Sequence, residues 1–287
     1  MSGPSDPTTT GPGASVDGTV PGAGPTGPRP TALVTGASHG IGRELARSLA
    51  HRGFDLVVAA EDDALETVAD ELRADGAATT AVRVDLRRHE EVDRLWEAVR
   101  ATGRPLAAAA LNAGVGQGGA FVEIDVDDEQ DVIDLNVTST VRLAKHVLRD
   151  MVSRGEGRVL VTSSIAATMP GTYQAVYNAS KSFLQSFAQA VGTETAESGV
   201  TVTALMPGPT ETEFFHRADM DDTRVGASDK DDPAQVAEQG VEAMLSGRAK
   251  IVAGSVGTKA QAATGTVLPD GVKARMHRRM AEPGSAR

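Results

Sequence analysis

The residues with the clearest chemical potential lie in the run YNASK, in which Tyr177 precedes Lys181 by four positions. Four residues make about one turn of an α-helix, so the phenol and the ammonium would project from the same helix face. A positive charge beside a phenol stabilises the phenolate and lowers the pKa of the hydroxyl group. The spacing fits an acid/base pair, although an incidental pair on a protein surface would have the same spacing.

Other polar side chains near this run are weaker candidates for the same chemistry. Tyr173, the only other tyrosine, lies two helical turns before Lys181, or about 12 Å along a helix axis. That separation is too long for a shared charge, so we expect Tyr173 to form a cleft wall or a helix cap. Ser163 and Ser164 are neighbours at the end of an apolar run, and adjacent strand residues face opposite sides. At most one of these serines can face the phenol.

A glycine-rich segment, TGASHGIG at residues 35–42, could hold a phosphate group. Gly36 permits a tight turn, and Gly40 and Gly42 let the backbone approach a phosphate and let the helix approach the sheet. The glycine spacing is G-x-x-x-G-x-G, which differs from the plain G-x-G-x-x-G fingerprint. Because the loop follows an apolar run and opens a segment with helical apolar spacing, it predicts a site for the diphosphate of a dinucleotide.

The elements that must position these residues alternate along the chain between apolar strands and helices. Right-handed crossovers between such strands predict an α/β fold: a Rossmann-type doubly wound parallel β-sheet with helices on both faces, in a single domain. Ligands of such sheets bind beyond the carboxyl ends of the strands, where the candidate residues fall. The predicted strands cover residues 31–35, 55–60, 79–84, 106–111, 158–163, 200–206 and 250–254, and the predicted helices residues 40–51, 62–76, 89–103, 129–153, 173–198 and 233–247.

Composition divides the chain into three parts. Residues 1–30 are rich in Gly and Pro, and we expect a disordered tail there. Residues 31–254 carry the Rossmann-fold domain, and residues 255–287 form a C-terminal extension that is partly helical and basic. Within the extension, KARMHRRM at residues 273–280 would form a helix with one thin apolar stripe, which we expect at the surface or at a subunit contact.

Charge and cysteine content exclude several classes of partner. The formal net charge of −11 argues against a nucleic-acid partner, whose binding surface would be basic. No apolar run reaches the ~18 residues that span a bilayer, and no secretory signal is evident, so we expect no membrane association and a cytoplasmic location. The chain has no cysteine, and its six histidines form no ligand pair, so we expect no metal site.

Taken in order, these motifs resemble the short-chain dehydrogenase/reductase family, in its ordinary single-domain form, over about residues 31–254. Besides the glycine loop and the Y-x-x-x-K run, the resemblance rests on segments that follow other predicted strands. These are Asn112, Ala113 and Gly114 after the fourth strand, Asn136 in the next helix, and Pro207 and Gly208 after the sixth strand, with Thr212 beyond them. The resemblance implies an enzyme that transfers a hydride between a nicotinamide cofactor, NAD or NADP, and a carbonyl or secondary alcohol.

The resemblance also implies roles for individual residues. Tyr177 would be the acid/base at the substrate oxygen, and Lys181 would lower its pKa and bind the nicotinamide ribose. Ser164 would hydrogen-bond the substrate oxygen, and Asn136 would hold a water that links Lys181 to solvent. The implied cofactor-binding residues are Gly36, Ser38, His39, Gly40, Ile41, Gly42, Glu61, Asp85, Leu86, Asn112, Ala113, Gly114, Tyr177, Lys181, Pro207, Gly208 and Thr212.

The end of the second predicted strand bears on the choice between NAD and NADP. Ala60 stands where NAD-dependent members often carry aspartate, and Glu61 stands where NADP-dependent members often carry arginine. Glu61 and Asp62 would repel a 2′-phosphate, which favours NAD(H), although both could instead be first-turn acids of the next helix. His39 stands where many NADP-dependent members have a cation, for which a neutral imidazole is a poor substitute. Asp85 would contact adenine or cap the third helix.

The segment after the sixth strand, residues 210–232, would cover the substrate. It is charged, and we expect a mobile, solvated lid in which Phe214 and Phe215 line the cleft or hold the lid down. It identifies no substrate beyond a small-molecule carbonyl or alcohol.

Two further expectations concern assembly and activity. Members of the family associate through their two long helices, so we expect a homo-oligomer, either a dimer or a tetramer; the second of these helices carries an apolar stripe of Phe183, Phe187 and Val191. The alternative to an enzyme is a catalytically silent cofactor-sensing or scaffold protein. The complete Ser, Tyr and Lys set favours the enzyme.

Overall fold

The computed structural model describes residues 28–286. The predicted tail at residues 1–30 therefore lies outside the described residues, apart from its last three positions. The described chain forms one seven-stranded sheet in which every neighbouring pair of strands is parallel. The strands are β1 (Thr31–Thr35), β2 (Asp55–Ala60), β3 (Thr79–Arg83), β4 (Leu106–Leu111), β5 (Gly157–Thr162), β6 (Val200–Pro207) and β7 (Lys250–Ala253).

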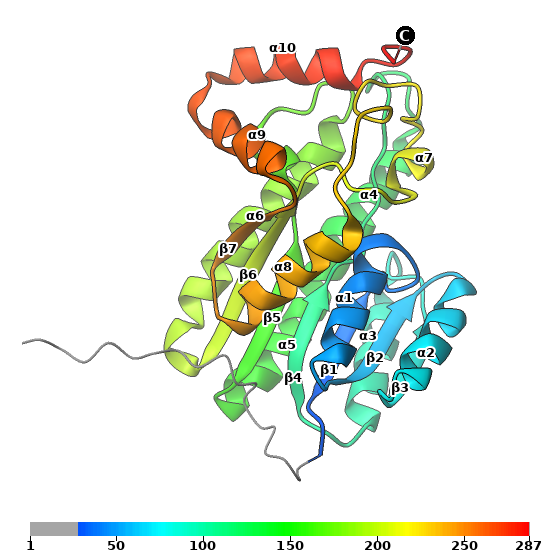
Figure 1. The fold of residues 1–287 in the computed structure, drawn as a ribbon, viewed down its shortest axis with the longest axis vertical. Helices are drawn as coiled ribbons and strands as arrows, with labels where there is room; N and C mark the ends of the chain where they lie inside the picture. Colours follow the sequence, from blue (N-terminus) through cyan, green and yellow to red (C-terminus); the bar gives the residue numbers. More distant parts are fainter. Residues whose placement is uncertain (1–27, 287) are drawn as a thin grey trace, which may run out of the picture.

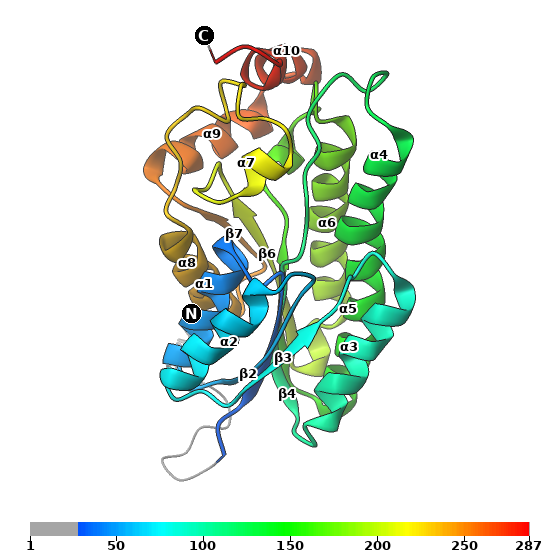
Figure 2. The same ribbon diagram turned by 90° about the vertical axis from the view of Figure 1, so that its right-hand side faces the viewer.

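Helices cover both faces of this sheet (Figures 1 and 2). One face carries α1 (Gly40–His51), α2 (Ala64–Ala74) and α8 (Pro233–Leu245). The other face carries α3 (His89–Ala101), α5 (Ser139–Arg154), which continues from α4 (Val126–Ile133), and α6 (Ala175–Glu194). The predicted doubly wound parallel sheet is therefore confirmed.

The alternation of strand side chains builds the two cores. Leu160 and Leu205 point into the core beneath α1 and α8, whereas their neighbours Val161 and Ala204 point into the core beneath α5 and α6. Strands that are covered on both faces need apolar residues at every position, which explains the continuous apolar runs in the sequence. Small residues such as Ala108, Ala109 and Ala110 let the helices pack closely on the central strand β4.

The strand order is β3-β2-β1-β4-β5-β6-β7, so the chain reverses its direction of winding between β1 and β4. The loops that leave these two strands diverge to opposite faces, which opens a crevice at the carboxyl end of the sheet. The glycine loop follows β1 and the Asn112–Gly114 loop follows β4. Topology thus brings both predicted cofactor loops to one crevice.

Two predicted helices differ in detail from those observed. The predicted helix at residues 129–153 begins earlier, at Val126, because the Asp125 carboxylate caps it by accepting a hydrogen bond from the Asp127 backbone N–H at 3.0 Å. It is interrupted by a π-helical turn, Asp134–Thr138. The predicted helix at residues 173–198 begins only at Ala175, since Tyr173 adopts a positive φ of 66° that a helix does not allow.

The C-terminal segment forms α9 (Val256–Val267) and α10 (Asp270–Ala281), which lie beyond the carboxyl end of the sheet, near the short helix α7 (Phe214–Arg217) (Figure 1). Backbone and side-chain hydrogen bonds hold α10 there: the Val225 N–H donates to the Met280 carbonyl at 3.0 Å, and the Thr172 hydroxyl donates to the Ala274 carbonyl at 3.0 Å. Within residues 28–286, no helix is long and apolar enough to cross a membrane.

Candidate active site

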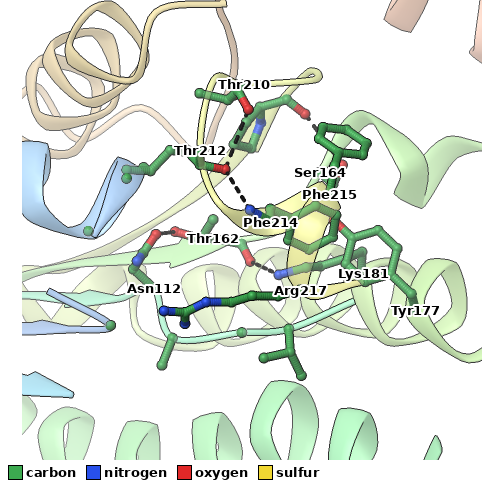
Figure 3. A pocket seen from close by; sticks show the side chains of 18 of the residues that line it. Asn112, Thr162, Ser164, Tyr177, Lys181, Thr210, Thr212, Phe214, Phe215 and Arg217 are labelled. Atoms are coloured by element: carbon green, nitrogen blue, oxygen red, sulfur yellow. Dashed lines mark hydrogen bonds between the residues drawn. The ribbon is translucent and has the colours of Figure 1, made fainter. Parts of the chain in front are cut away.

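A single pocket at the carboxyl end of the sheet brings the predicted cofactor residues together (Figure 3). Every residue that the sequence assigned to the cofactor lines this pocket, and so does Ser164. Asn136 is the one predicted site residue that does not line it. The loops after β1, β2, β4, β5 and β6 all contribute to the wall, as expected for a crevice at a topological switch point.

The glycine loop is packed so tightly that side chains cannot enter it. A Cβ atom on Gly42 would lie 1.9 Å from the Gly36 carbonyl oxygen, and a Cβ on Gly36, whose φ is +65°, would lie 2.9 Å from the Ala113 Cα. A Cβ on Gly40 would lie 2.6 Å from the Thr212 methyl group. The loop therefore exposes backbone and the N-terminus of α1, which together suit an anion such as a diphosphate.

Hydrogen bonds connect the central strands beneath this loop. The Asn112 side-chain amide donates to the Thr35 carbonyl at 3.2 Å and accepts from the Thr162 hydroxyl at 3.0 Å. The Thr35 hydroxyl accepts from the Asn112 backbone N–H at 2.9 Å. Asn112 thus fixes the ends of β1, β4 and β5 relative to one another, and the floor of the pocket is rigid.

The YNASK run lies on the first turns of α6, and both of its reactive side chains reach the pocket. The Lys181 ammonium lies 5.8 Å from the centroid of the Tyr177 ring and donates to the Thr162 carbonyl at 3.0 Å (Figure 3). The Ser164 hydroxyl donates to the Pro207 carbonyl at 3.4 Å and lies close enough to the Tyr177 hydroxyl to lower its pKa. Ser163 instead donates to the Lys181 backbone carbonyl at 2.7 Å. Of the two neighbouring serines, the structure therefore brings Ser164 to the phenol and leaves Ser163 in a packing role.

Burial dominates the acid–base properties of this pair. Removal from water raises the pKa of Tyr177 to about 12, although the neighbouring Ser164 hydroxyl acts in the opposite direction. Burial lowers the pKa of Lys181 to about 8. The net shift of the Tyr177 pKa is upward, opposite to the direction expected from a neighbouring positive charge, because burial of the phenol is its largest cause.

Asn136 lies in the π-helical turn and is fully buried. Its side-chain oxygen accepts from the Val115 N–H at 2.9 Å, and its amide nitrogen donates to the Val115 carbonyl and to the Ser180 hydroxyl, each at 2.9 Å. A Cβ on Gly114 would lie 2.9 Å from the Asn136 oxygen and 3.2 Å from the Lys181 nitrogen. The amide therefore fixes the loop after β4 against α6, directly beside Lys181.

Acidic groups dominate the wall where the second and third strands end. Glu61, Asp62 and Asp85 all line the pocket there. Asp62 accepts from the Ser38 hydroxyl at 2.8 Å, and His39 contacts the same hydroxyl at 3.0 Å. The helix-cap alternative for Asp85 is not observed, because α3 is preceded by Arg88 as its N-terminal cap.

Arg87 is a partner of this acidic wall that the sequence analysis missed. Its guanidinium donates to Glu61, Asp85 and Asp131, with distances of 2.8 Å to each carboxylate. These contacts hold the pKa of Asp85 below its usual value, against the effect of burial, and raise that of Arg87. Three carboxylates neutralise this cation, and it does not line the pocket. The sequence feature that could have identified Arg87 is its position two residues after Asp85, where a strand ends.

The segment after β6 closes the pocket through its two phenylalanines. The Phe214 ring packs on the Tyr177 ring with centroids 5.1 Å apart, and Phe215 meets Phe214 edge-on at 5.4 Å. Phe215 also belongs to an apolar cluster with Ala218, Met220 and Ala281 of α10. Both alternatives for the phenylalanines therefore hold, since they line the pocket and also hold the segment down.

The C-terminal extension contributes to the pocket wall, which the sequence analysis did not anticipate. Gln261 of α9 and His277, Met280 and Ala281 of α10 line it. The basic residues at 273–280 predicted a helix at the surface or at a subunit contact. The residues of this helix that reach the pocket are instead non-basic or weakly basic ones, such as His277 and Met280. Gln174 and Arg217 also line the pocket without having been predicted (Figure 3). In the part of the chain that the structure describes, no cluster of His, Asp or Glu could hold a metal ion.

Comparison with known proteins gives concordant results. Residues 30–223 match the family model described as short chain dehydrogenase. The 3-oxoacyl-[acyl-carrier-protein] reductase FabG of Escherichia coli is 33% identical over 196 residues, which are 68% of this chain and 79% of the relative.

Two solved structures are also similar. One is a short-chain dehydrogenase from Sphingobium yanoikuyae in complex with NADPH, with a TM-score of 0.72 and 31% identity over 78% of this chain and 86% of the other. The other is a short chain dehydrogenase/reductase from Burkholderia phymatum in complex with NAD, with a TM-score of 0.71 and 25% identity over 78% and 88% of the two chains.

Proposed function

Since the chain belongs to the short-chain dehydrogenase/reductase family and is an NAD(P)-dependent oxidoreductase, we propose that Tyr177 is its acid/base and that the pocket around α6 is its active site. The reaction transfers a hydride between the nicotinamide and a carbonyl or secondary alcohol. The observation that carries the assignment is that Ser164, Tyr177 and Lys181 line one pocket together with the glycine loop, with Lys181 one helical turn from Tyr177.

The residues present fit a dinucleotide. Gly36, Gly40 and Gly42 leave no room for side chains, so the backbone of the glycine loop and the first turn of α1 face the pocket directly. This cradle would hold the diphosphate, the wall with Glu61 and Asp85 would hold the adenosine, and Lys181 would hold the nicotinamide ribose. When bound, the nicotinamide supplies the position that gives or accepts the hydride.

The side chains of the pocket would orient the substrate and transfer the proton. Ser164 and Tyr177 would both hydrogen-bond the substrate oxygen, and this bidentate contact would orient the carbonyl carbon. In reduction, the Tyr177 hydroxyl donates its proton to the oxygen as negative charge develops there; in oxidation, the phenolate accepts the proton of the alcohol. Asn136 would act as a positioning residue, because it fixes Gly114 and Val115 beside Lys181.

This assignment predicts opposite pH profiles for the two directions. Because burial raises the pKa of Tyr177 to about 12, the phenol is protonated at neutral pH and is ready to donate to a carbonyl. The kcat/KM of alcohol oxidation should therefore rise with pH above neutrality, by up to about tenfold per pH unit, whereas carbonyl reduction should not. Initial rates in both directions across the pH range measure this.

The variant Ser164→Ala tests whether the pH dependence of oxidation reports the pKa of Tyr177. The Ser164 hydroxyl lowers the pKa of Tyr177, so its loss should move the rise in oxidation rate to higher pH, in addition to a lower rate. An oxidation rate that falls as pH rises above neutrality would contradict the acid/base role of Tyr177.

We also propose a preference for NAD(H) over NADP(H). A 2′-phosphate at this wall would meet Glu61, Asp62 and Asp85, and no arginine or lysine lines the described pocket there. Two unit charges ~5 Å apart repel by ~3 kcal/mol at an effective dielectric of ~20. The half-exposed position of Glu61 and the ion pairs that Arg87 forms with Glu61 and Asp85 weaken this repulsion. The kcat/KM with NAD⁺ should exceed that with NADP⁺ by about 10-fold or more.

Charge removal tests this preference. Glu61→Gln combined with Asp62→Asn should lower the NAD/NADP ratio of kcat/KM, mainly through a smaller KM for NADP⁺. Asp63→Asn is the matched control, because Asp63 is 87% exposed, pairs with Arg83 and does not line the pocket. A wild-type enzyme that prefers NADP⁺ would show that the carboxylates do not decide the specificity.

We propose further that residues 31–254 form the catalytic domain, that residues 255–287 complete its pocket, and that the protein is a cytoplasmic homo-oligomer. The outer faces of α5 and α6 support association. Phe183 is 41% exposed and stacks on Phe187 with centroids 5.9 Å apart, and Val152 is also 41% exposed. Such apolar groups on two neighbouring helices suit a contact between copies, which light scattering in solution would measure.

A further inference from the structure

His277 of α10 is built into the pocket wall, and one of its ring nitrogens has no hydrogen-bond partner among residues 28–286. His277 and Ala281 are four residues apart and Met280 lies between them, so the three share one helix face, and all line the pocket. His277 is only 6% exposed. Of the two ring nitrogens, only Nδ1 has a hydrogen-bond partner within residues 28–286, so Nε2 is open to a pocket ligand or to water.

The tautomer of His277 follows from its one hydrogen bond. Nδ1 lies 2.9 Å from the Thr172 backbone carbonyl, which can only accept, so Nδ1 carries the hydrogen. Burial lowers the pKa of the ring, which favours the neutral form. Nε2 then bears a lone pair, and among residues 28–286 no group hydrogen-bonds to it. A ligand that matches this atom must donate an O–H or N–H group.

The pocket that His277 lines adjoins further space beyond Tyr177. Met169, Val225 and Met280 line the pocket and also line a second cavity, of about 830 Å³, between the segment after β6 and helices α9 and α10. Gln261 also lines both spaces. A volume of this order holds a drug-sized ligand. Charged residues such as Lys230, Asp231 and Lys273 also line the second cavity. A substrate at Tyr177 therefore has room for a long body toward α10, and its apolar part would lie against Met169, Val225 and Met280.

We propose that the substrate is a carbonyl compound or secondary alcohol with an extended apolar body and a hydroxyl group remote from the reacting carbon, and that His277 Nε2 accepts a hydrogen bond from this hydroxyl. The inference rests on the proposed function of the pocket. It makes His277 a specificity-determining residue, which touches the substrate but takes no part in proton transfer. The Nδ1 bond to Thr172 orients the ring for this contact.

A series of ketones with identical reacting ends tests the proposal. The chains increase in length and end in a hydroxyl, a methoxy or a methyl group; only the hydroxyl can donate a hydrogen bond. At the chain length that reaches His277, the wild-type kcat/KM should be about 10- to 100-fold higher for the hydroxyl compound than for its methoxy and methyl analogues. Equal rates for all three end groups at every length would overturn the inference.

Two isosteric variants separate recognition from structure. In His277→Asn the amide nitrogen can replace Nδ1 and keep the bond to Thr172, but nothing replaces Nε2. In His277→Gln the amide oxygen can reach the position of Nε2. The hydroxyl preference should disappear in His277→Asn, mainly through KM, and should partly return in His277→Gln. Persistence of the preference in His277→Asn would overturn the inference.

Arg279→Ala is the control for a general disturbance of α10, because Arg279 is an exposed residue of the same helix. It should keep the preference and the melting temperature of the wild type. Turnover of the ketones without a hydroxyl preference would overturn the inference and leave the proposed function intact. Failure to turn over any compound with either cofactor would overturn both.

Discussion

Replacement of Tyr177 by phenylalanine should lower kcat by about 10²–10⁴-fold and leave the dissociation constant of the cofactor almost unchanged. Only the hydroxyl group leaves, so the ring still packs against Phe214, and Lys181 still donates to the Thr162 carbonyl. The proton donor at the substrate oxygen is lost, together with the group that neighbours the Ser164 hydroxyl. Steady-state rates and a cofactor titration of the same preparation measure the two effects.

The chain offers a matched control in its only other tyrosine. Tyr173→Phe removes the same hydroxyl from a residue whose phenol donates to the Glu282 carboxylate at 3.3 Å, at the contact with the C-terminal segment. Its cost should be a small loss of stability, about 1 kcal/mol or less, with kcat near that of the wild type. If Tyr177→Phe retained wild-type turnover, or if both variants lost it equally, the role given to Tyr177 would be wrong.

Gly42→Ala should produce the largest structural effect of a single methyl group. The added Cβ would lie 1.9 Å from the Gly36 carbonyl oxygen and 2.6 Å from the Asn112 amide nitrogen. The first of these is a backbone atom, so no side-chain rotation relieves the clash and the loop after β1 must move. We expect a loss of roughly 3 kcal/mol in unfolding free energy, a fall in Tm of several degrees, and cofactor affinity weakened by about 10-fold or more.

A glycine in open space provides the comparison. A Cβ on Gly257, in α9, would approach nothing closer than the Ser255 hydroxyl at 3.6 Å. Because alanine is favoured over glycine within helices by about 1 kcal/mol, Gly257→Ala should leave Tm equal or slightly higher and cofactor binding unchanged. Wild-type cofactor affinity in Gly42→Ala, measured by titration, would refute the assignment of this loop to the diphosphate.

The sheet could be predicted from the sequence because its strands are apolar on both faces. Runs such as LVVAA at residues 56–60 have no polar position that could face water, which leaves a doubly covered parallel sheet as the consistent arrangement. The first residues of α4 and α6 were harder to predict from the sequence. One depends on the Asp125 side-chain cap, and the other on the positive φ of Tyr173.

The glycine loop, the Asn112–Gly114 loop and Pro207–Gly208 could be predicted because each lies at the end of a strand, and topology gathers strand ends at one edge of the sheet. The pKa values of the reactive side chains could not be predicted from the sequence, because they depend on how deeply each group is buried. The phenol and the ammonium are one turn apart as expected, yet burial moves the pKa of Tyr177 up and that of Lys181 down. The roles of Arg87 and His277 depend on which residues distant in sequence lie beside them, such as Asp131 and Thr172.

The central claim is that this pocket transfers a hydride between a nicotinamide and a carbonyl or secondary alcohol. Its most direct test follows the near-ultraviolet absorbance of the reduced nicotinamide while the wild-type protein is mixed with a panel of ketones, aldehydes and secondary alcohols, with NAD(H) and NADP(H) in parallel. We predict substrate-dependent turnover, faster with NAD(H) than with NADP(H). Measurable cofactor binding without turnover of any compound, by either cofactor, would contradict the claim and favour a cofactor-sensing role for the fold.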